Sequence, residues 1–419
     1  MNILIGVAIG LLILMSLVTA HEFGHFLMAR RNGVKVLEYG ICFPPRAIAW
    51  VHQPQLDKKG NPILKKNGKP AYKWVKIPKE DWDKPQDHLI FSLNWLPIGG
   101  FCQMDGESDA DTDVATFGAA TFWQKTKILF GGVVTNWIIG IITFTILAWI
   151  GMPALLDNQF TIANDETVDY TPVEVTRVIE NSPAERAGFQ VGDKILSVND
   201  KLVYNGYDEA FSSFAGEDVY YEILRKNPDN DEDKTLTLTA HLNEKDNEWG
   251  YLLGINMASN QVYRKYTWSA PIVGIGTTAQ LTAKTFEGLG QMLWKVVKGA
   301  FSQLSFSSDT RDAGREAIAE AGDSVTGPVG IIGVIFPSVA KSGIRTTLST
   351  FALISVSLAC MNVLPIPALD GGRWFMIFLS RLKHKRLTKE YEERIVGRTM
   401  IGLLIFMAFI TVLDVIRFF

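Results

Sequence analysis

The sequence predicts a multi-span α-helical membrane protein with four transmembrane helices and one α+β domain outside the membrane. Three observations support this prediction. Lys and Arg are spread unevenly among the polar segments. The central stretch, roughly 157–265, is polar and rich in turn residues. Four uncharged, mostly apolar runs are near or above the length of a bilayer crossing, and they lie at 3–20, 128–156, 348–369 (resuming at 374–379) and 400–413.

The basic residues predict the orientation of the chain. Residues 151–170 contain no Lys or Arg. Basic residues instead follow the first run, precede the second and separate the last two: Arg30, Arg31, Lys35, Lys125, Lys127, Arg381, Lys383, Lys385, Arg386, Lys389, Arg394 and Arg398. Because cytoplasmic loops carry the excess of positive charge, we expect the N-terminus and the polar middle outside, and residues 30–125 and 381–398 in the cytoplasm.

Bulk composition says little about the partners or the fold of the chain. The chain has 419 residues, 47% of them hydrophobic, and a net charge of -3, and nothing in it predicts a nucleic-acid partner. Its cysteines are Cys42, Cys102 and Cys360. They lack zinc-finger spacing and avoid the exported middle, so we expect small buried residues and no disulfide framework.

The first predicted transmembrane helix, 1–29, ends in the motif His21-Glu22-Phe23-Gly24-His25. Histidines four apart project from one helix face and can share a metal ion, with Glu22 close enough to act as general base without being a ligand. Burying such groups in a span is costly unless they coordinate or face water, which argues against a pair of core histidines. A cleaved signal peptide is disfavoured because no basic residue precedes the run.

A third metal ligand should come from another span at the same depth. Asp370 lies in a predicted broken third helix, 346–380, toward its basic end. Pro365, Pro367 and Gly371-Gly372 prevent a regular helix there, although a proline kink used for packing is the alternative. Asp414 is a rival ligand in the fourth helix, 397–417, and pairing with Arg417 is its alternative role.

Together, HEFGH and NVLPIPALDG resemble the site-2 protease family of intramembrane zinc metalloproteases, in its bacterial RseP-type branch with a single PDZ domain. The resemblance implies one Zn²⁺ per chain held by His21, His25 and Asp370, with Glu22 as general base. It also implies that Asn362 and Pro365 handle the substrate, and a polarising contact from Asn362 to the scissile carbonyl is chemically reasonable. The expected location is the cell inner (cytoplasmic) membrane.

After the first helix, residues 30–122 should form a cytoplasmic-side region. Residues 96–104 resemble the family's re-entrant β-hairpin, where Gly100 and Phe101 would pair with an extended substrate. Between 51 and 87 the chain is rich in lysine, which predicts a solvated loop or contact with anionic lipid; the lysines are Lys58, Lys59, Lys65, Lys66, Lys69, Lys73, Lys76 and Lys79. The acidic stretch 105–113 predicts a solvated loop.

The second predicted helix, 123–153, contains Gly131-Gly132-Val133-Val134-Thr135-Asn136-Trp137. This stretch resembles the family's second-span motif but departs from it at Val133 and Trp137, where Pro and Phe are usual. We therefore predict that Asn136 makes a hydrogen bond that packs helices together.

The exported residues 168–258 resemble a PDZ domain. Alternation at 173–178 predicts a strand, and strands are also expected at 195–198, 220–225 and 235–241, with a turn at 227–233. Ser182, Pro183 and Gly188 predict the N-cap, first residue and stop of a short helix. Such a unit could bind a peptide or act as a size-exclusion plug, and the sequence does not separate these roles.

Two segments remain. Residues 259–345 predict an amphipathic segment on the outer leaflet, followed by a turn at 327–330, because apolar residues between 268 and 305 recur at helical spacing with lysines between them. Residues 381–396 predict a basic cytoplasmic loop.

The expected function is an intramembrane zinc endopeptidase that cleaves transmembrane segments of single-span proteins after extracytoplasmic trimming. The resemblance implies substrates such as anti-sigma factors and remnant signal peptides, so the partners are membrane-spanning proteins and the lipid bilayer. One alternative is a membrane-anchored zincin of protein quality control, which usually has a glutamate ligand soon after its histidines; here Glu38 lies beyond three basic residues. The other is a non-catalytic PDZ membrane scaffold.

Overall fold

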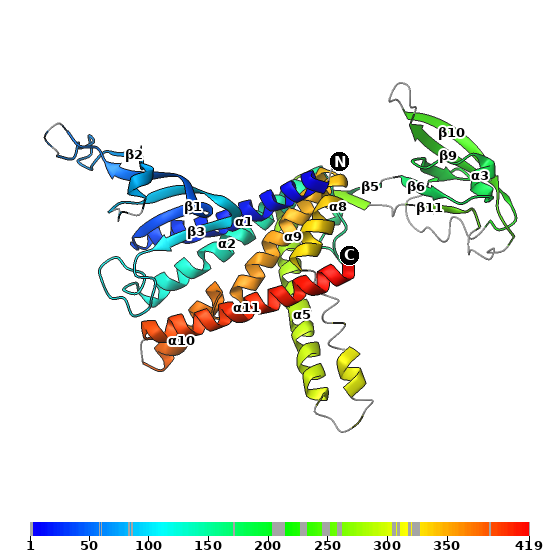
Figure 1. Ribbon diagram of the computed structural model, residues 1–419. Coiled ribbons are helices and arrows are strands. Elements are labelled where there is room, and N and C mark those ends of the chain that lie inside the picture. Colours follow the sequence, from blue (N-terminus) through cyan, green and yellow to red (C-terminus); the bar gives the residue numbers. More distant parts are fainter. Residues whose placement is uncertain are drawn as a thin grey trace. The chain divides into compact units, whose positions relative to one another are not determined.

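A computed structural model of the chain describes residues 3–418, except 58, 60, 83, 85–86, 171, 203–213, 227–232, 245–251, 258–261, 304–306, 308–310, 317–319, 321–326 and 385–386. The chain forms two compact units (Figure 1). The first comprises Met1–Leu147 and Ala270–Phe419, and the second comprises Ala148–Ser269. The predicted turn at 227–233 therefore lies almost wholly outside the described residues.

Within the described residues, four helices are long and apolar enough to cross a membrane. They are α1 (Ile3–Arg31), α2 (Phe122–Ile150), α9 (Ile344–Val363) and α11 (Lys389–Phe418). Each coincides with one of the four apolar runs. The prediction of a membrane protein with four apolar helices is confirmed, whereas its orientation stays a prediction.

Glycines bring α1 and α2 into backbone contact. A Cβ added at Gly24 would overlap the Gly131 carbonyl oxygen, and one added at Gly131 would lie 2.7 Å from the Gly24 carbonyl oxygen. Small residues of this kind allow membrane helices to approach closely. On the other side of α2, the Ser355 hydroxyl of α9 donates to the Asn136 backbone carbonyl at 2.8 Å. The helices that carry the conspicuous motifs are therefore packed tightly together.

The third predicted span is broken, as the prolines indicate. The α9 helix ends at Val363, residues 364–369 are not helical, and α10 (Asp370–Leu382) then begins. Gly371 and Gly372 let the connection fold back over the first turn of α10, since a Cβ at either would overlap the carbonyl oxygen of Val363 or Ile366. Asp370 is thereby placed at the start of a helix. Because α10 runs to Leu382 and α11 starts at Lys389, the connecting loop is shorter than the predicted 381–396.

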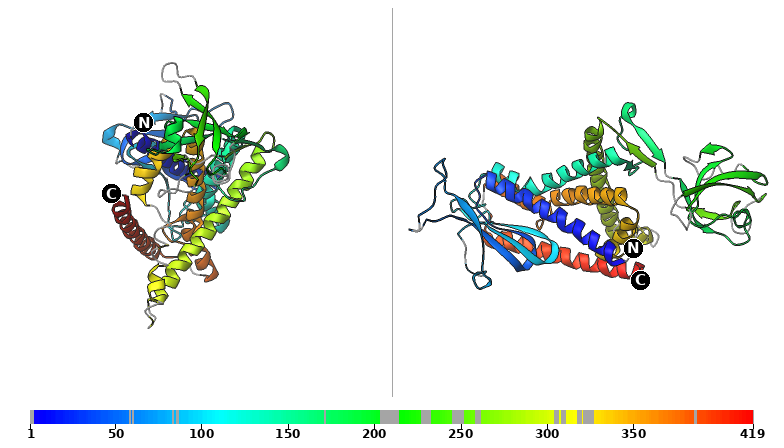
Figure 2. Two further views of the ribbon diagram at one scale, coloured as in Figure 1. Left: turned by 90° about the vertical axis from the view of Figure 1, so that its right-hand side faces the viewer. Right: turned by 90° about the horizontal axis from the view of Figure 1, so that it is seen from above.

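An antiparallel sheet lies along α1. Its strand order is β2–β1–β3, from β2 (Tyr72–Lys76), β1 (Val36–Pro54) and β3 (Ile90–Met104). Gly100 of β3 contacts the Thr19 backbone, since a Cβ added at Gly100 would lie 3.3 Å from the Thr19 Cα. The Tyr39 hydroxyl donates to the Thr19 carbonyl at 2.8 Å. Figures 1 and 2 show β1 and β3 beside α1, so the hairpin follows the span just before His21.

Two loop predictions differ from the structure. The lysine-rich stretch is a ribbon, because β2 pairs with β1 from Pro54–Tyr72 to Trp50–Lys76 and isolated bridges extend it. A short 3₁₀-helix, η1 (Lys79–Asp81), follows the ribbon, and Lys58 is outside the described residues.

The acidic stretch 105–113 is not simply a solvated loop. Asp109 is 6% exposed and pairs with buried Lys125. The Glu392 carboxylate accepts from the Ser108 hydroxyl at 3.0 Å and from the Asp109 backbone amide at 3.1 Å. The prediction of solvation is wrong at Ser108 and Asp109 because partners distant in sequence, on α2 and α11, cover this part of the loop.

The segment 259–345 is only partly amphipathic surface. In α5 (Ala270–Ser302) one face of the first turns is buried, whereas Ile272 and Ile275 are exposed. On the buried face Gly274 contacts α2, since a Cβ added at Gly274 would lie 2.9 Å from the Ile141 carbonyl oxygen. Short helical elements follow: α7 (Pro328–Gly330), the π-helix η3 (Ile331–Ile335) and α8 (Phe336–Lys341). The Asp414 carboxylate accepts from the backbone amides of Gly327 at 3.1 Å and Gly330 at 2.8 Å. The predicted turn at 327–330 is therefore wrong: Pro328–Gly330 are helical, and Asp414 holds the backbone amides at the start of this helix.

The described residues of the second unit form two sheets. One has the order β10–β9–β7–β6–β11 with β8 paired to β7, and the other has the order β4–β12–β5. Their strands are β4 (Met152–Pro153), β5 (Thr167–Tyr170), β6 (Val173–Val178), β7 (Lys194–Val198), β8 (Lys201–Leu202), β9 (Asp218–Lys226), β10 (Asp233–His241), β11 (Ile255–Met257) and β12 (Val262–Lys265). The four predicted strands are confirmed.

The short helix of this unit is capped as predicted. The Ser182 hydroxyl accepts from the Glu185 amide before α3 (Pro183–Ala187), and Gly188 ends the helix with a φ of 84°. The apolar core includes Val175, Ile195 and Tyr221. In the 3₁₀-helix η2 (Ala163–Asp165), the Asp165 carboxylate accepts hydrogen bonds from the backbone amides of Thr267 and Ser269, both at 2.9 Å.

Candidate metal centre

His21, His25 and Asp370 meet in the first unit. The two histidines occupy successive turns of α1 and are each 6% exposed. Their Nε2 atoms are 3.1 Å apart. Asp370 Oδ2 lies 3.0 Å from His21 Nε2 and 3.3 Å from His25 Nε2. Three ligand-type atoms from two distant segments therefore form a nearly equilateral triangle.

The triangle has dimensions close to those that zinc requires. With zinc bonds of about 2.0–2.2 Å to nitrogen and oxygen, neighbouring ligands of a tetrahedral ion are roughly 3.3–3.6 Å apart. The sides of the triangle, 3.0, 3.1 and 3.3 Å, lie within about 0.3 Å of the lower end of that range. Two imidazoles and one carboxylate are also a donor set of catalytic zinc sites, which leave a fourth position open. The residues present thus fit one zinc ion.

Gly132 of α2 provides space beside the triangle. A Cβ at this position would lie 2.6 Å from both His21 Nε2 and His25 Nε2, which is closer than any ordinary contact. In the sequence, Gly132 stands out only as part of the stretch Gly131–Trp137 that resembles the family's second-span motif. Its position could have been inferred only by knowing that α2 crosses α1 at Gly24.

A second layer of contacts orients the imidazoles. His25 Nδ1 is 2.8 Å from the Ile128 carbonyl oxygen and donates to it, which leaves the Nε2 lone pair facing the triangle. Zinc-binding histidines commonly make such a contact, and it fixes both the tautomer and the ring orientation. His21 Nδ1 is 3.2 Å from Asn136 Nδ2. Asn136 therefore does more than the helix packing predicted for it.

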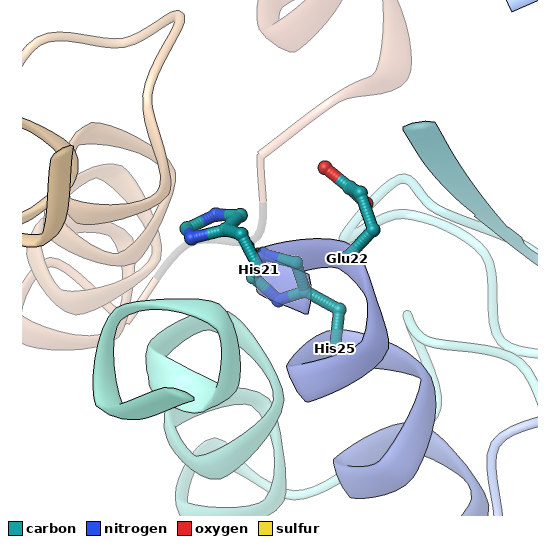
Figure 3. Close-up of side chains that lie close together, drawn as sticks. All are labelled: His21, Glu22 and His25. Atoms are coloured by element: carbon teal, nitrogen blue, oxygen red, sulfur yellow. Dashed lines mark hydrogen bonds between the residues drawn. The ribbon is translucent and has the colours of Figure 1, made fainter. Parts of the chain in front are cut away.

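Glu22 lies beside the imidazoles and does not form part of the triangle. Figure 3 shows His21, Glu22 and His25 together, and one ligand-type atom from each lies within 4.8 Å of the other two. The Glu22 carboxylate also interacts with the backbone amide of Cys102 in β3. This position suits a group that exchanges protons with a molecule held next to the metal ligands.

The predicted substrate-contacting residues lie on both sides of this centre. Asn362 is half-buried in the last turn of α9, and Pro365 is exposed in the non-helical segment that leads to Asp370. Gly100 and Phe101 lie in β3, whose register with β1 pairs Phe101 with Gly40 and Gly100 with Ile41. The geometry is compatible with the predicted roles, which stay predictions.

A buried charged network stands behind Asp370. Arg373 Nη2 donates to the Glu107 carbonyl at 2.8 Å and lies 3.7 Å from Glu392 Oε1. Lys125 pairs with Asp109 and donates to the Gly118 carbonyl at 2.9 Å. A pocket of about 570 Å³ opens beside the network, and its lining includes Gln103, Ala368, Arg373, Lys389 and Glu393. The network joins the start of α10, and hence Asp370, to α2 and α11.

The chain resembles known proteins over nearly its whole length. Residues 9–55 and 75–408 match the profile of peptidase family M50, so the unmatched gap falls on the lysine-rich ribbon. A protein of Clostridium perfringens, named as a candidate zinc metalloprotease, is 27% identical over 409 residues, which are 97% of each chain. The zinc metalloprotease RasP of Bacillus licheniformis is 23% identical over 463 residues, covering 98% of each chain.

Proposed function

The chain belongs to peptidase family M50, the site-2 protease family, and from this premise we propose that it cuts its substrates inside the membrane. It is a zinc-dependent metalloprotease, as the family and the names of its relatives show. In the proposed site, His21, His25 and Asp370 hold one zinc ion and Glu22 is the general base. The observation that carries the proposal is the triangle of ligand atoms between apolar helices.

The proposed chemistry divides between the ion and Glu22. Zinc, when bound, polarises the peptide carbonyl and allows water to act as a nucleophile near neutral pH. Glu22 takes a proton from the attacking water and delivers it to the leaving nitrogen. Asn362 would contact the scissile carbonyl, and Pro365 would keep the neighbouring backbone extended.

The substrate would bind as an extended segment next to β3. This strand is at the edge of the sheet, and the backbone amide of its residue Cys102 interacts with the Glu22 carboxylate. An edge strand offers backbone donors and acceptors to an added strand with little dependence on side chains. A transmembrane helix must unwind before it can pair in this way. Helix-destabilising residues in the substrate, and pairing at Gly100 and Phe101, would lower that cost.

We further propose the predicted orientation in the inner membrane. His21 and His25 lie near the end of α1 whose last turn contains Arg30 and Arg31, so the positive-inside rule puts the centre toward the cytoplasm. Residues 168–258 would then be an extracytoplasmic PDZ-like domain that binds a peptide or filters substrates by size. Single-span proteins already shortened outside, such as anti-sigma factors and remnant signal peptides, are the proposed substrates.

Purified full-length protein and a trimmed single-span substrate provide the test. Glu22→Gln should keep stoichiometric zinc and lose cleavage, because it removes only the base. Asp370→Ala should lose zinc as well. Asp414→Asn is the matched control, since this aspartate is also buried in a span but binds Gly327 and Gly330, and it should keep its zinc. Cleavage by Glu22→Gln would reject Glu22 as the base, and absence of cleavage by the zinc-loaded wild type would favour the scaffold alternative.

A further inference from the structure

We propose that Asn136 is a positioning residue whose side-chain amide holds His21 in the tautomer that zinc binding requires. The inference rests on the proposed ligand set. Asn136 is fully buried in α2. Its Nδ2 is 3.2 Å from His21 Nδ1, whereas its Oδ1 is buried without a hydrogen-bond partner among the described residues. An unpartnered buried oxygen next to a metal ligand requires an explanation, because leaving it unpaired costs roughly 1–3 kcal/mol.

The chemistry of the imidazole explains the unpartnered oxygen of Asn136. A neutral histidine that binds a metal through Nε2 carries its proton on Nδ1, and that N–H needs an acceptor. For His25 the acceptor is the Ile128 carbonyl. For His21 the group that faces Nδ1 is the Asn136 amide. When Nδ2 donates to Nδ1, the His21 proton must instead sit on Nε2, where it reaches Asp370 Oδ2 at 3.0 Å.

Two amide orientations therefore correspond to two tautomers. With Nδ2 toward the ring, the His21 proton bonds to Asp370 and Nε2 has no lone pair to offer. A half-turn about the Cβ–Cγ bond of Asn136 presents Oδ1 instead. This oxygen then accepts from Nδ1–H, and the lone pair of Nε2 becomes available to the metal. Zinc loading is expected to select the second orientation, which also gives the unpartnered oxygen its hydrogen bond.

The packing role of Asn136 can be separated from this one. The link between α2 and α9 uses the backbone carbonyl of Asn136, to which the Ser355 hydroxyl donates at 2.8 Å. The side chain of Asn136 is therefore not needed for that contact. Ser355→Ala would remove the interhelical hydrogen bond and leave the His21 contact in place, which makes it the matched control.

The experiment measures zinc affinity of the purified full-length protein by competition with a chelator of known affinity. Asn136→Leu removes the acceptor while keeping the same branched arrangement of non-hydrogen atoms, and should weaken zinc binding by about 10- to 100-fold, the usual effect of losing a group that hydrogen-bonds to a metal ligand. Asn136→Asp keeps an acceptor and should bind zinc within a few-fold of the wild type. Ser355→Ala should leave affinity unchanged.

The outcomes separate a positioning role from a packing role. If Asn136→Leu binds zinc like the wild type, or if Asn136→Asp is as weak as Asn136→Leu, the inference is overturned. Should Asn136→Leu not fold, Asn136→Asp decides alone: near wild-type affinity supports the acceptor role, and a loss of more than about 10-fold rejects it. Asp370→Ala and His21→Ala serve as references, because unchanged affinity in both would reject the ligand set underlying the inference.

Discussion

Gly132 provides a sharp structural test of the metal centre. Gly132→Ala adds one methyl group, whose carbon would lie 2.6 Å from the Nε2 atoms of His21 and His25. Ordinary contacts begin at 3.4 Å, so the overlap is 0.8 Å (3.4 minus 2.6) with each ring. The rings have little freedom to retreat, because Ile128 holds His25 and Asn136 contacts His21. At least one Nε2 must therefore leave the triangle.

We expect Gly132→Ala to lose at least about 10-fold in zinc affinity, the lower end of what disturbed ligand support costs, and to lose most of its proteolytic activity. Chelator competition and cleavage of a single-span substrate would measure both effects. Gly402→Ala in the apolar helix α11 is the control, since no atom lies within 4 Å of its added Cβ. Unchanged zinc affinity and activity in Gly132→Ala would refute the geometry proposed for the site.

Three further predictions concern other parts of the molecule. Asp109→Ala removes the carboxylate that pairs with the buried Lys125, whose charge the Gly118 carbonyl alone does not neutralise. This variant should lower the free energy of unfolding by about 3–5 kcal/mol, as measured by thermal or denaturant unfolding, and an effect below about 1 kcal/mol would contradict this. Partial desolvation would raise the pKa of Asp165, but hydrogen bonds from Ser269 and Thr267 lower it from 3.8 to about 2. The ionised Asp165 carboxylate therefore stabilises the folded state fully above its unfolded pKa, and this stabilisation is lost as the pH falls through its folded pKa. Asp165→Asn should make the free energy of unfolding depend less on pH between about pH 4 and 2. An unchanged pH dependence would contradict this. Removal of metal by a chelator should stop proteolysis and added Zn²⁺ should restore it, whereas activity that survives complete metal loss would contradict a zinc enzyme.

Local patterns allowed the sequence to predict part of this architecture. Long apolar runs predicted the four helices, and Pro365 and Pro367 predicted the break before Asp370. The approach of His21 to His25 follows from four-residue helical spacing alone. Predicting Asp370 as their neighbour required the further assumption that groups at the same membrane depth can meet. The 3.0 Å distance between Asp370 Oδ2 and His21 Nε2 agrees with this assumption.

Contacts between distant segments could not be predicted in the same way. Asp109 looked solvated because its neighbours are acidic and small, and only the folded chain brings Lys125 and Glu392 around it. Gly132 and Asn136 occupy turns of α2 that face the histidines, and which turns do so depends on where α2 crosses α1. A one-dimensional pattern contains no information on that crossing.

The position of the cut bond tests the central proposal most directly. Purified protein would be incubated with a single-span substrate in lipid vesicles, and both new ends would be identified by mass spectrometry. We predict a cut within the apolar segment of the substrate, made by the wild type and absent with Glu22→Gln. Cuts confined to the substrate's water-exposed residues would contradict intramembrane proteolysis and would favour a membrane-anchored zincin.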